Sequence, residues 1–253
     1  MRLIVSFLIL MGVVAAACND KEVISYPALS DYYPLKVGRT YTYMMDSIKT
    51  INFGASLNTT YYLAKDSVES QFNDAQGRLS FRIFRYLRDT PQTKPWTYLA
   101  TYVATFDDAK KQVEYVDDRN YRYIVLKQPV TEGYSWKGNS YIDTKSGSSL
   151  VKYMDDWDYT YGNIDQPFTV RKGRFDSTIT VLQVDQISPP GPFDPNSYQQ
   201  TNYSVEVYAR GVGLIYKEFI HKTWQKTPTS AGYWDQDPNN LTYGIKLNLR
   251  DYK

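Results

Sequence analysis

Short runs of alternating apolar and polar residues limit the folds open to this chain more than any other feature. In residues 79–88 the odd-numbered positions up to Ile83 are apolar, and the positions between them are polar. A two-residue period of this kind is typical of a β-strand with one buried face. The alternation slips between Phe84 and Arg85, where a β-bulge would restore it. We therefore expect a strand here, with a bulge near its middle.

Segments of the same character recur along the chain, separated by clusters of Asp, Asn, Gly and Pro that favour turns. None carries the 3.6-residue apolar stripe of a helix. The pattern predicts an antiparallel all-β fold, a strongly curved sheet or partly closed barrel with long loops and little helix, as a single domain over residues 31–253. The other expected strands are 41–48, 59–68, 96–106, 112–116, 121–127, 149–154, 168–171, 178–186, 203–209, 214–224 and 244–249. The proline-rich residues 187–200 predict a long surface loop within one hairpin.

The first residues are typical of an export signal. Arg2 precedes an apolar run over residues 3–14, which is too short to span a bilayer, and three alanines follow before Cys18. Cys18 is the chain's one cysteine, and it stands where a bacterial lipoprotein signal has the residue that receives acyl chains such as palmitate. We expect a signal peptide over residues 1–17 and a lipid-anchored tether over residues 18–30. Cleavage by ordinary signal peptidase, which also accepts an Ala-x-Ala ending, is the alternative.

The source is expected to be a member of the Bacteroidetes. The acidic start of the tether resembles surface-export tags of that phylum, and three Asp-Ser tripeptides, around Ser47, Ser67 and Ser177, fit its glycosylation pattern. The high tyrosine content, 25 residues, agrees with this interpretation.

Three stretches, residues 33–43, 170–181 and 208–218, resemble a pattern of exported bacterial lipoproteins of Bacteroidetes type whose role is not known. In that family the pattern implies a sheet wrapped around one side of a core, similar to the half-barrels of periplasmic lipid and lipoprotein carriers such as LolA. Glycines stand where the strands of these stretches are expected to begin or bend. The motif residues are therefore interpreted as structural, and the resemblance brings no catalytic residue.

The charge balance excludes some classes of partner. Lys and Arg number 29 against 27 Asp and Glu, a formal net charge of +2, without the basic clusters of a nucleic-acid-binding protein. With Cys18 acylated, no thiol is left for a disulfide or a thiolate metal site. We therefore expect no nucleic acid and no cofactor, a membrane partner through the lipid anchor, and tyrosines that mainly pack on the sheet.

Catalytic constellations are sparse. His221 is the chain's one histidine, and it is expected as a solvated strand residue. The sequence therefore does not favour serine–histidine catalysis or a histidine-rich metal site. The best enzyme candidates are Asp155, Asp156 and Asp158, because a carboxylate beside a tryptophan can act as an acid while a neighbour stays ionised. An acidic loop is the alternative interpretation of this cluster.

Two further candidate sites lie near the C-terminus. Asp235, Asp237 and Asn239 begin like a calcium loop with oxygen ligands at alternate positions, although the EF-hand glycine and glutamate are missing. A polar hairpin loop is the alternative there. The nearby aromatic residues could stack sugar rings or simply pack on a sheet edge; they are Trp224, Tyr233, Trp234 and Tyr243.

Together these observations predict a lipid-anchored, non-enzymatic protein of the outer membrane, on its periplasmic or cell-surface side, acting as a binding or assembly component. Three alternatives stay open: a carrier of lipid or another apolar ligand inside a half-barrel, a surface glycan-binding protein, and a glycoside hydrolase.

Overall fold

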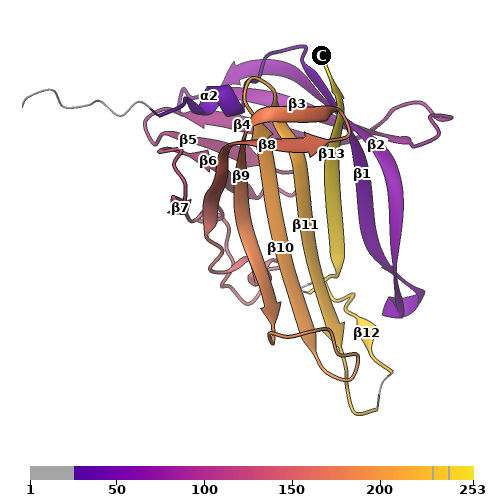
Figure 1. Ribbon diagram of the computed structural model, residues 1–253. Helices are drawn as coiled ribbons and strands as arrows, with labels where there is room; N and C mark the ends of the chain where they lie inside the picture. The colour runs from indigo at the N-terminus through magenta and orange to yellow at the C-terminus, as the bar shows by residue number, and fades with distance from the viewer. Residues whose placement is uncertain (1–25, 230, 239) are drawn as a thin grey trace, which may run out of the picture.

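The computed structural model describes residues 26–229, 231–238 and 240–253 (Figure 1). Its short helices are α2 (Leu29–Tyr32) and the 3-10 helices η1 (Asn52–Gly54) and η2 (Lys152–Met154). Its strands are β1 (Thr40–Ile51), β2 (Ser56–Asn73), β3 (Leu79–Asp89), β4 (Thr97–Asp107), β5 (Gln112–Val116), β6 (Arg122–Lys127), β7 (Ser135–Trp136), β8 (Tyr159–Val170), β9 (Gly173–Ser188), β10 (Gln199–Ala209), β11 (Gly213–Gln225), β12 (Tyr233–Trp234) and β13 (Tyr243–Tyr252).

All but one of these strands form a single antiparallel path in the order β6-β5-β4-β3-β2-β1-β13-β11-β10-β9-β8-β7, and β12 pairs beside it with β11. The C-terminal strand β13 lies between β1 and β11, so it joins the two halves of the sheet. The sheet curves into a nearly closed barrel (Figure 1). The expected fold class, an antiparallel all-β sheet curved into a partly closed barrel, is confirmed.

The two end strands of the path, β6 and β7, meet through a few specific contacts. The backbone N–H of Ile124 donates to the carbonyl of Gly138 at 2.6 Å, and the indole N–H of Trp136 donates to the carbonyl of Ile124 at 2.8 Å. Farther along β6, the Tyr161 hydroxyl donates to the Lys127 carbonyl and accepts its N–H, both at 2.9 Å. A tyrosine side chain thus takes the place that a neighbouring backbone would occupy in a fully closed barrel.

Alternation along the strands decides which side chains point inward. In β1, Tyr41, Tyr43 and Met45 are buried, and the residues between them are partly exposed. In β3 the buried positions continue as Phe81, Ile83 and then Arg85. Every second side chain of this strand therefore continues to point inward, although the third of them is charged. The register of the β3–β4 ladder shifts only after it, between Arg85 and Tyr86, one residue beyond the predicted slip.

Two expectations need correction. The strand expected over residues 149–154 is wrong: this segment is a loop that ends in η2. Its polar backbone groups are satisfied locally, because the Val151 N–H bonds to the Ser149 hydroxyl at 3.2 Å and the Met154 N–H to the Val151 carbonyl at 2.9 Å. The expected tether, residues 18–30, is also too long at its end, because Leu29 of α2 is buried in the core.

Several turns agree with the predictions. The proline-rich segment connects β9 to β10, which pair with each other, so it does lie within one hairpin. The glycine-containing stretch after β8 forms the tight turn into β9. Val170 pairs with Gly173 across this turn, and the backbone φ of Gly173 is 139°. Within the described residues, no helix is both long and apolar enough to cross a bilayer.

Candidate functional site

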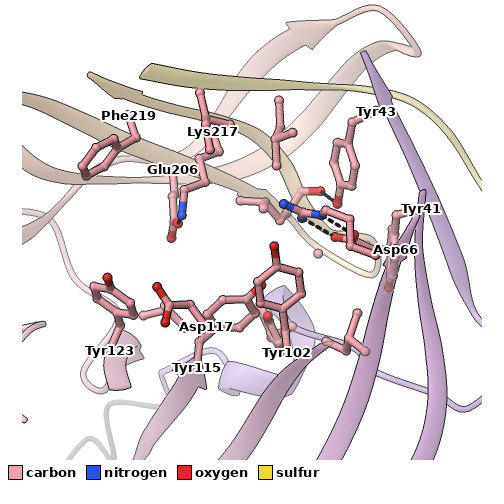
Figure 2. Close-up of a pocket in the computed structure, with 18 of the residues that line it drawn as sticks. Tyr41, Tyr43, Asp66, Tyr102, Tyr115, Asp117, Tyr123, Glu206, Lys217 and Phe219 are labelled. Carbon is pink, nitrogen blue, oxygen red and sulfur yellow. Dashed lines mark hydrogen bonds and ion pairs between the residues drawn. The ribbon is translucent and has the colours of Figure 1, made fainter. Parts of the chain in front are cut away.

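The barrel contains a cavity of about 360 Å³ with a mostly apolar wall (Figure 2). Strands from both halves of the sheet line it, together with the segment that follows α2 and the loop around Trp157. Tyrosine is prominent in this wall. The lining tyrosines are Tyr33, Tyr41, Tyr43, Tyr102, Tyr115, Tyr123, Tyr159, Tyr208 and Tyr243.

A buried ion pair crosses from β2 to β3 on the inner face. Asp66 and Arg85 are direct cross-strand partners, and both Arg85 Nε and Nη2 donate to the Asp66 carboxylate at 2.6 Å. Each residue is 8% exposed. The Arg85 guanidinium also lies over the Tyr102 ring, 4.9 Å from its centroid. Two charges removed from water are tolerated when hydrogen bonds to each other replace those to water, as they do here. The pair is therefore a stable part of the cavity wall.

A second ion pair faces the cavity from the other half of the sheet. Glu206 of β10 and Lys217 of β11 are also cross-strand partners, and Lys217 Nζ donates to Glu206 Oε1 at 2.8 Å. The Tyr208 hydroxyl donates to the other carboxylate oxygen at 2.5 Å. Figure 2 shows this pair across the cavity from Tyr115 and Asp117. Glu206 is therefore a fully engaged carboxylate.

Two neighbouring tyrosines of β1 differ in how their hydroxyls are satisfied. The Tyr43 hydroxyl donates to the Leu214 carbonyl at 3.0 Å. The Tyr41 hydroxyl is buried yet has no hydrogen-bond partner within the described residues. Tyr41 is 6% exposed and lines the cavity beside Asp66, its cross-strand partner (Figure 2). A buried polar group without a partner is uncommon and needs an explanation.

Burial keeps the cavity phenols neutral. Desolvation raises the pKa of Tyr41 to about 12, and it also raises the pKa of Tyr102 and of Tyr115. The rings of the last two stack at a centroid distance of 5.3 Å. A protonated phenol both donates and accepts hydrogen bonds, so the wall offers neutral polar groups together with its aromatic surface.

The cavity opens where exposed residues join its lining. Leu99 at the start of β4 is 48% exposed, and Asp118 and Arg119 in the β5–β6 turn are exposed as well. Asp117, in the same turn, accepts from Arg119 in an ion pair of 3.3 Å. The opening is therefore bordered by a turn whose charges are partly neutralised.

The structure separates the four aromatic residues that the sequence grouped together. Trp224 and Trp234 are in contact, with ring centroids 5.1 Å apart, and Tyr233 adjoins them on β12. Phe193 of the β9–β10 loop stacks on Trp234 at 5.6 Å and an angle of 16°. The face of Trp234 toward this loop is therefore covered by a side chain of the same protein.

Tyr243, the fourth of these residues, lies elsewhere. On β13 it stacks on Phe219 at 5.1 Å, forms a 3.0 Å hydroxyl contact with Tyr153, and lines the cavity. The four aromatic residues therefore do not form one binding platform. Glycan binding by them stays a prediction.

The proposed calcium loop is described only in part. The Asp235 carboxylate accepts from Gln225 Nε2 at 2.9 Å and from the Asp237 N–H at 2.8 Å, the geometry of a polar turn. Asn239 lies outside the described residues. Among those that are described, no group of three or more His, Cys, Asp or Glu is arranged to hold a metal ion. Calcium binding here stays a prediction.

The acidic cluster faces away from the cavity. Asp156 and Asp158 are exposed and lie beside Lys137, at 3.9 and 3.2 Å, whereas Trp157 between them is buried and lines the cavity. Asp155 accepts from the Thr144 hydroxyl at 2.6 Å, at the edge of a separate polar hollow. Hydrolysis by these carboxylates stays a prediction.

Two other sequence predictions concern His221 and Cys18. His221 was expected in solvent, but it is fully buried, stacked on Tyr153 at 3.7 Å, with Nδ1 2.6 Å from Asn202 Oδ1. Cys18 lies outside the described residues, so its lipidation stays a prediction.

Apart from Tyr243, sequence reasoning did not identify the residues that line the cavity. A signal for one of them was present, because Arg85 stands at the inward parity of a strand whose other inward positions are apolar. A charge at such a position indicates a buried partner, but only the strand register identifies it as Asp66.

Comparisons with known proteins add little to this description. No family model matches the chain, and no curated protein does. Among solved structures, it is similar to one from Parabacteroides distasonis that is provisionally described as a lipoprotein. The identity is 12%, the match covers 88% of this chain and 98% of that chain, and the TM-score is 0.33. A likeness this weak carries no argument, so function has to be argued from the site.

Proposed function

We propose that this protein is an envelope lipoprotein whose barrel binds a small, largely apolar ligand. The observation that carries the proposal is the cavity of about 360 Å³ inside the barrel, with a mostly apolar wall and its cations held in ion pairs. Ligand pockets in proteins are typically roughly 300–1,000 Å³, apolar, and furnished with few polar groups. The cavity fits this description at the lower end of the range.

The proposed role is binding without chemistry. Glu206, the most buried carboxylate of the cavity, already accepts hydrogen bonds from Lys217 and Tyr208. Catalytic acids and bases need a proton that can be exchanged with a substrate, and a saturated carboxylate is poorly placed for that. Of the three carboxylates that the sequence favoured, Asp156 and Asp158 are exposed, and Asp155 is partly buried and accepts a hydrogen bond from Thr144 outside the cavity.

The proposed location follows from the signal sequence. Acylation at Cys18 would anchor the chain to the outer membrane, and the short segment between Cys18 and Leu29 would hold the barrel close to the lipid surface. A ligand-binding barrel at that position could take up an apolar compound from the envelope or deliver one to it. The membrane is then the anchor, and the ligand is the partner of the cavity.

A hydrocarbon probe tests the proposal directly. The soluble body, residues 19–253, includes every described residue and is titrated with 1,6-diphenylhexatriene, whose fluorescence rises on entering an apolar site. We expect saturable binding of one probe per chain. In parallel, native mass spectrometry of freshly purified protein is expected to show an added mass that denaturation removes.

A matched pair of variants assigns the binding to the cavity. Val125 is 5% exposed and lines it, whereas Val37 is 48% exposed and does not. Val125→Phe adds bulk inside and is expected to weaken probe binding at least tenfold, whereas Val37→Phe should leave it unchanged. Equal binding by both variants, or no saturable binding by the unaltered protein, would contradict the proposal.

A further inference from the structure

Tyr41 belongs to the cavity wall, and its hydroxyl is a buried polar group that the protein leaves unsatisfied. It has no hydrogen-bond partner within the described residues, although Tyr41 is 6% exposed. Gly213 and Pro34 lie nearby: a Cβ placed on Gly213 would lie 3.8 Å from this oxygen and 3.7 Å from Pro34. Burying a hydroxyl without a partner costs free energy, and a ligand that supplied the partner would recover it.

Three other polar groups of the wall are already bonded within the protein. Tyr43 and Tyr208 donate their hydroxyl protons to Leu214 and Glu206. The Asp66 carboxylate beside Tyr41 is turned to Arg85, which binds both of its oxygens. A ligand that bonds to the Tyr41 hydroxyl would therefore gain a hydrogen bond without breaking one within the protein.

The charges of the wall argue against an ionised ligand. Among the described residues, the cations that line the cavity are Arg85, Arg119 and Lys217, and each is in an ion pair. The lining carboxylates outnumber them, because Asp118 stands at the rim in addition to the three that are paired. An anion would meet no available counter-ion, and it would have to break a buried pair or remain uncompensated. A cation would find the surplus carboxylate, Asp118, only at the exposed rim, where water screens the charge.

We infer that the ligand is an uncharged amphiphile with one hydroxyl or carbonyl group, which hydrogen-bonds to Tyr41 while the hydrocarbon body fills the cavity. This inference rests on the proposed function and specifies its ligand class. In Figure 2, Tyr41 and Asp66 lie at one side of the cavity and Phe219 and Tyr123 at the other. The polar end of the ligand is thereby assigned to the β1–β2 side, and its apolar end to the aromatic side.

Three ten-carbon probes that differ only in the head group test the inference. Decan-1-ol, decanoate and decylammonium are each used to displace diphenylhexatriene from the soluble body below their aggregation concentrations. Decan-1-ol is expected to bind at least tenfold more tightly than either ion. Equal or tighter binding of decanoate or decylammonium would overturn the inference.

Variants then assign the preference to one oxygen. Tyr41→Phe removes only the unpartnered hydroxyl, so it should weaken decan-1-ol binding about fivefold, leave diphenylhexatriene binding within twofold, and not lower the melting temperature. The control is Tyr161→Phe, which lies outside the cavity lining and whose hydroxyl already has a protein partner in Lys127. This variant should lower the melting temperature and keep the preference for the alcohol. Unchanged decan-1-ol binding by Tyr41→Phe would overturn the assignment to Tyr41.

The outcomes separate this inference from the proposed function. If diphenylhexatriene binds but the alcohol shows no preference, the barrel still binds an apolar ligand and only the head-group inference is overturned. If neither the hydrocarbon nor the alcohol binds, the proposed function and the inference are both overturned.

Discussion

At the scale of single residues, the interior of this barrel contains several buried side chains that are polar or charged. His221 is an example, because it is fully buried between Tyr153 and Asn202 although a strand histidine is ordinarily a surface residue. Burial lowers the pKa of its imidazole to about 4, and the nearby charge of Asp235 opposes this effect without cancelling it. The folded protein thus holds this histidine neutral.

This burial predicts a loss of stability in mildly acidic solution. In the unfolded chain the imidazole takes up a proton below pH 6.5, but in the folded protein it does so only near pH 4. Between these values the unfolded state binds more protons, so the free energy of unfolding should fall as pH falls, by about 3 kcal/mol over the window. Urea unfolding at a series of pH values measures this slope.

The control for this prediction is His221→Gln, which cannot titrate. Carboxylates contribute to the pH dependence of both proteins, so the difference between their slopes isolates the histidine. The variant is expected to be less stable at pH 7 but to lose less stability on acidification. Parallel curves for the two proteins would contradict the prediction.

At the scale of strands, register is what pairs the inward charges. Asp66 and Arg85 are opposite each other in the β2–β3 ladder, and Glu206 and Lys217 in the β10–β11 ladder. A shift of either ladder by one residue would turn one charge outward and leave the other unpaired inside the barrel. The buried pairs therefore select the register as well as furnish the cavity wall.

A double-mutant cycle tests the β2–β3 pair. Arg85→Met leaves the Asp66 carboxylate buried without its partner, and it should lower the free energy of unfolding by about 3–5 kcal/mol. Combining it with Asp66→Leu replaces the pair with apolar groups and should restore most of that loss. Chemical denaturation of the single and double variants gives the coupling energy.

An exposed ion pair provides the matched control. Lys172 and Asp251 are 2.8 Å apart, with side chains 41% and 44% exposed. Lys172→Met should cost less than about 1 kcal/mol, because water screens such a pair. If Arg85→Met cost no more than Lys172→Met, the β2–β3 pair would have no special role in the fold.

At the scale of the whole molecule, a curved sheet that does not close fully has two edge strands with unpaired backbone groups. Here the edges are β6 and β7, and β8 reaches across to β6 through the hydroxyl of Tyr161. A sheet edge with unpaired backbone groups invites association with other chains. The bonds from Tyr161 and Trp136 to the β6 backbone satisfy part of that edge.

This closure predicts a local effect of removing one oxygen. Tyr161→Phe leaves the N–H and the carbonyl of Lys127 without these bonds, so it should destabilise the protein by about 1–3 kcal/mol. Hydrogen exchange should accelerate at the β6 amides and remain slow in β10, which is paired on both sides.

The control for the closure is a tyrosine on the outer surface. Tyr98 is 55% exposed, and its hydroxyl contacts Thr101. Tyr98→Phe should change neither the stability nor the exchange of β6. Unaltered exchange of β6 in Tyr161→Phe would show that this edge is held by other contacts.

The sequence by itself determined the class of the fold and the position of most strands. Alternation is a local property: a period of two residues forces opposite faces in any extended chain, so 79–88 could be identified as a strand without knowledge of its neighbours. The wrong strand at 149–154 marks the limit of this reasoning. Buried residues such as Val151 and Met154 also occur in a loop whose backbone is bonded locally.

Tertiary structure alone decided the site. The partner of the inward charge of Arg85 is an example, because a local pattern does not show which residue of another strand lies opposite it. The cavity tyrosines come from strands far apart in the chain, and one of the expected surface aromatics, Tyr243, faces inward because β13 lies between β1 and β11. The cavity forms only when the sheet curves into a nearly closed barrel, so no single segment of the sequence predicts it.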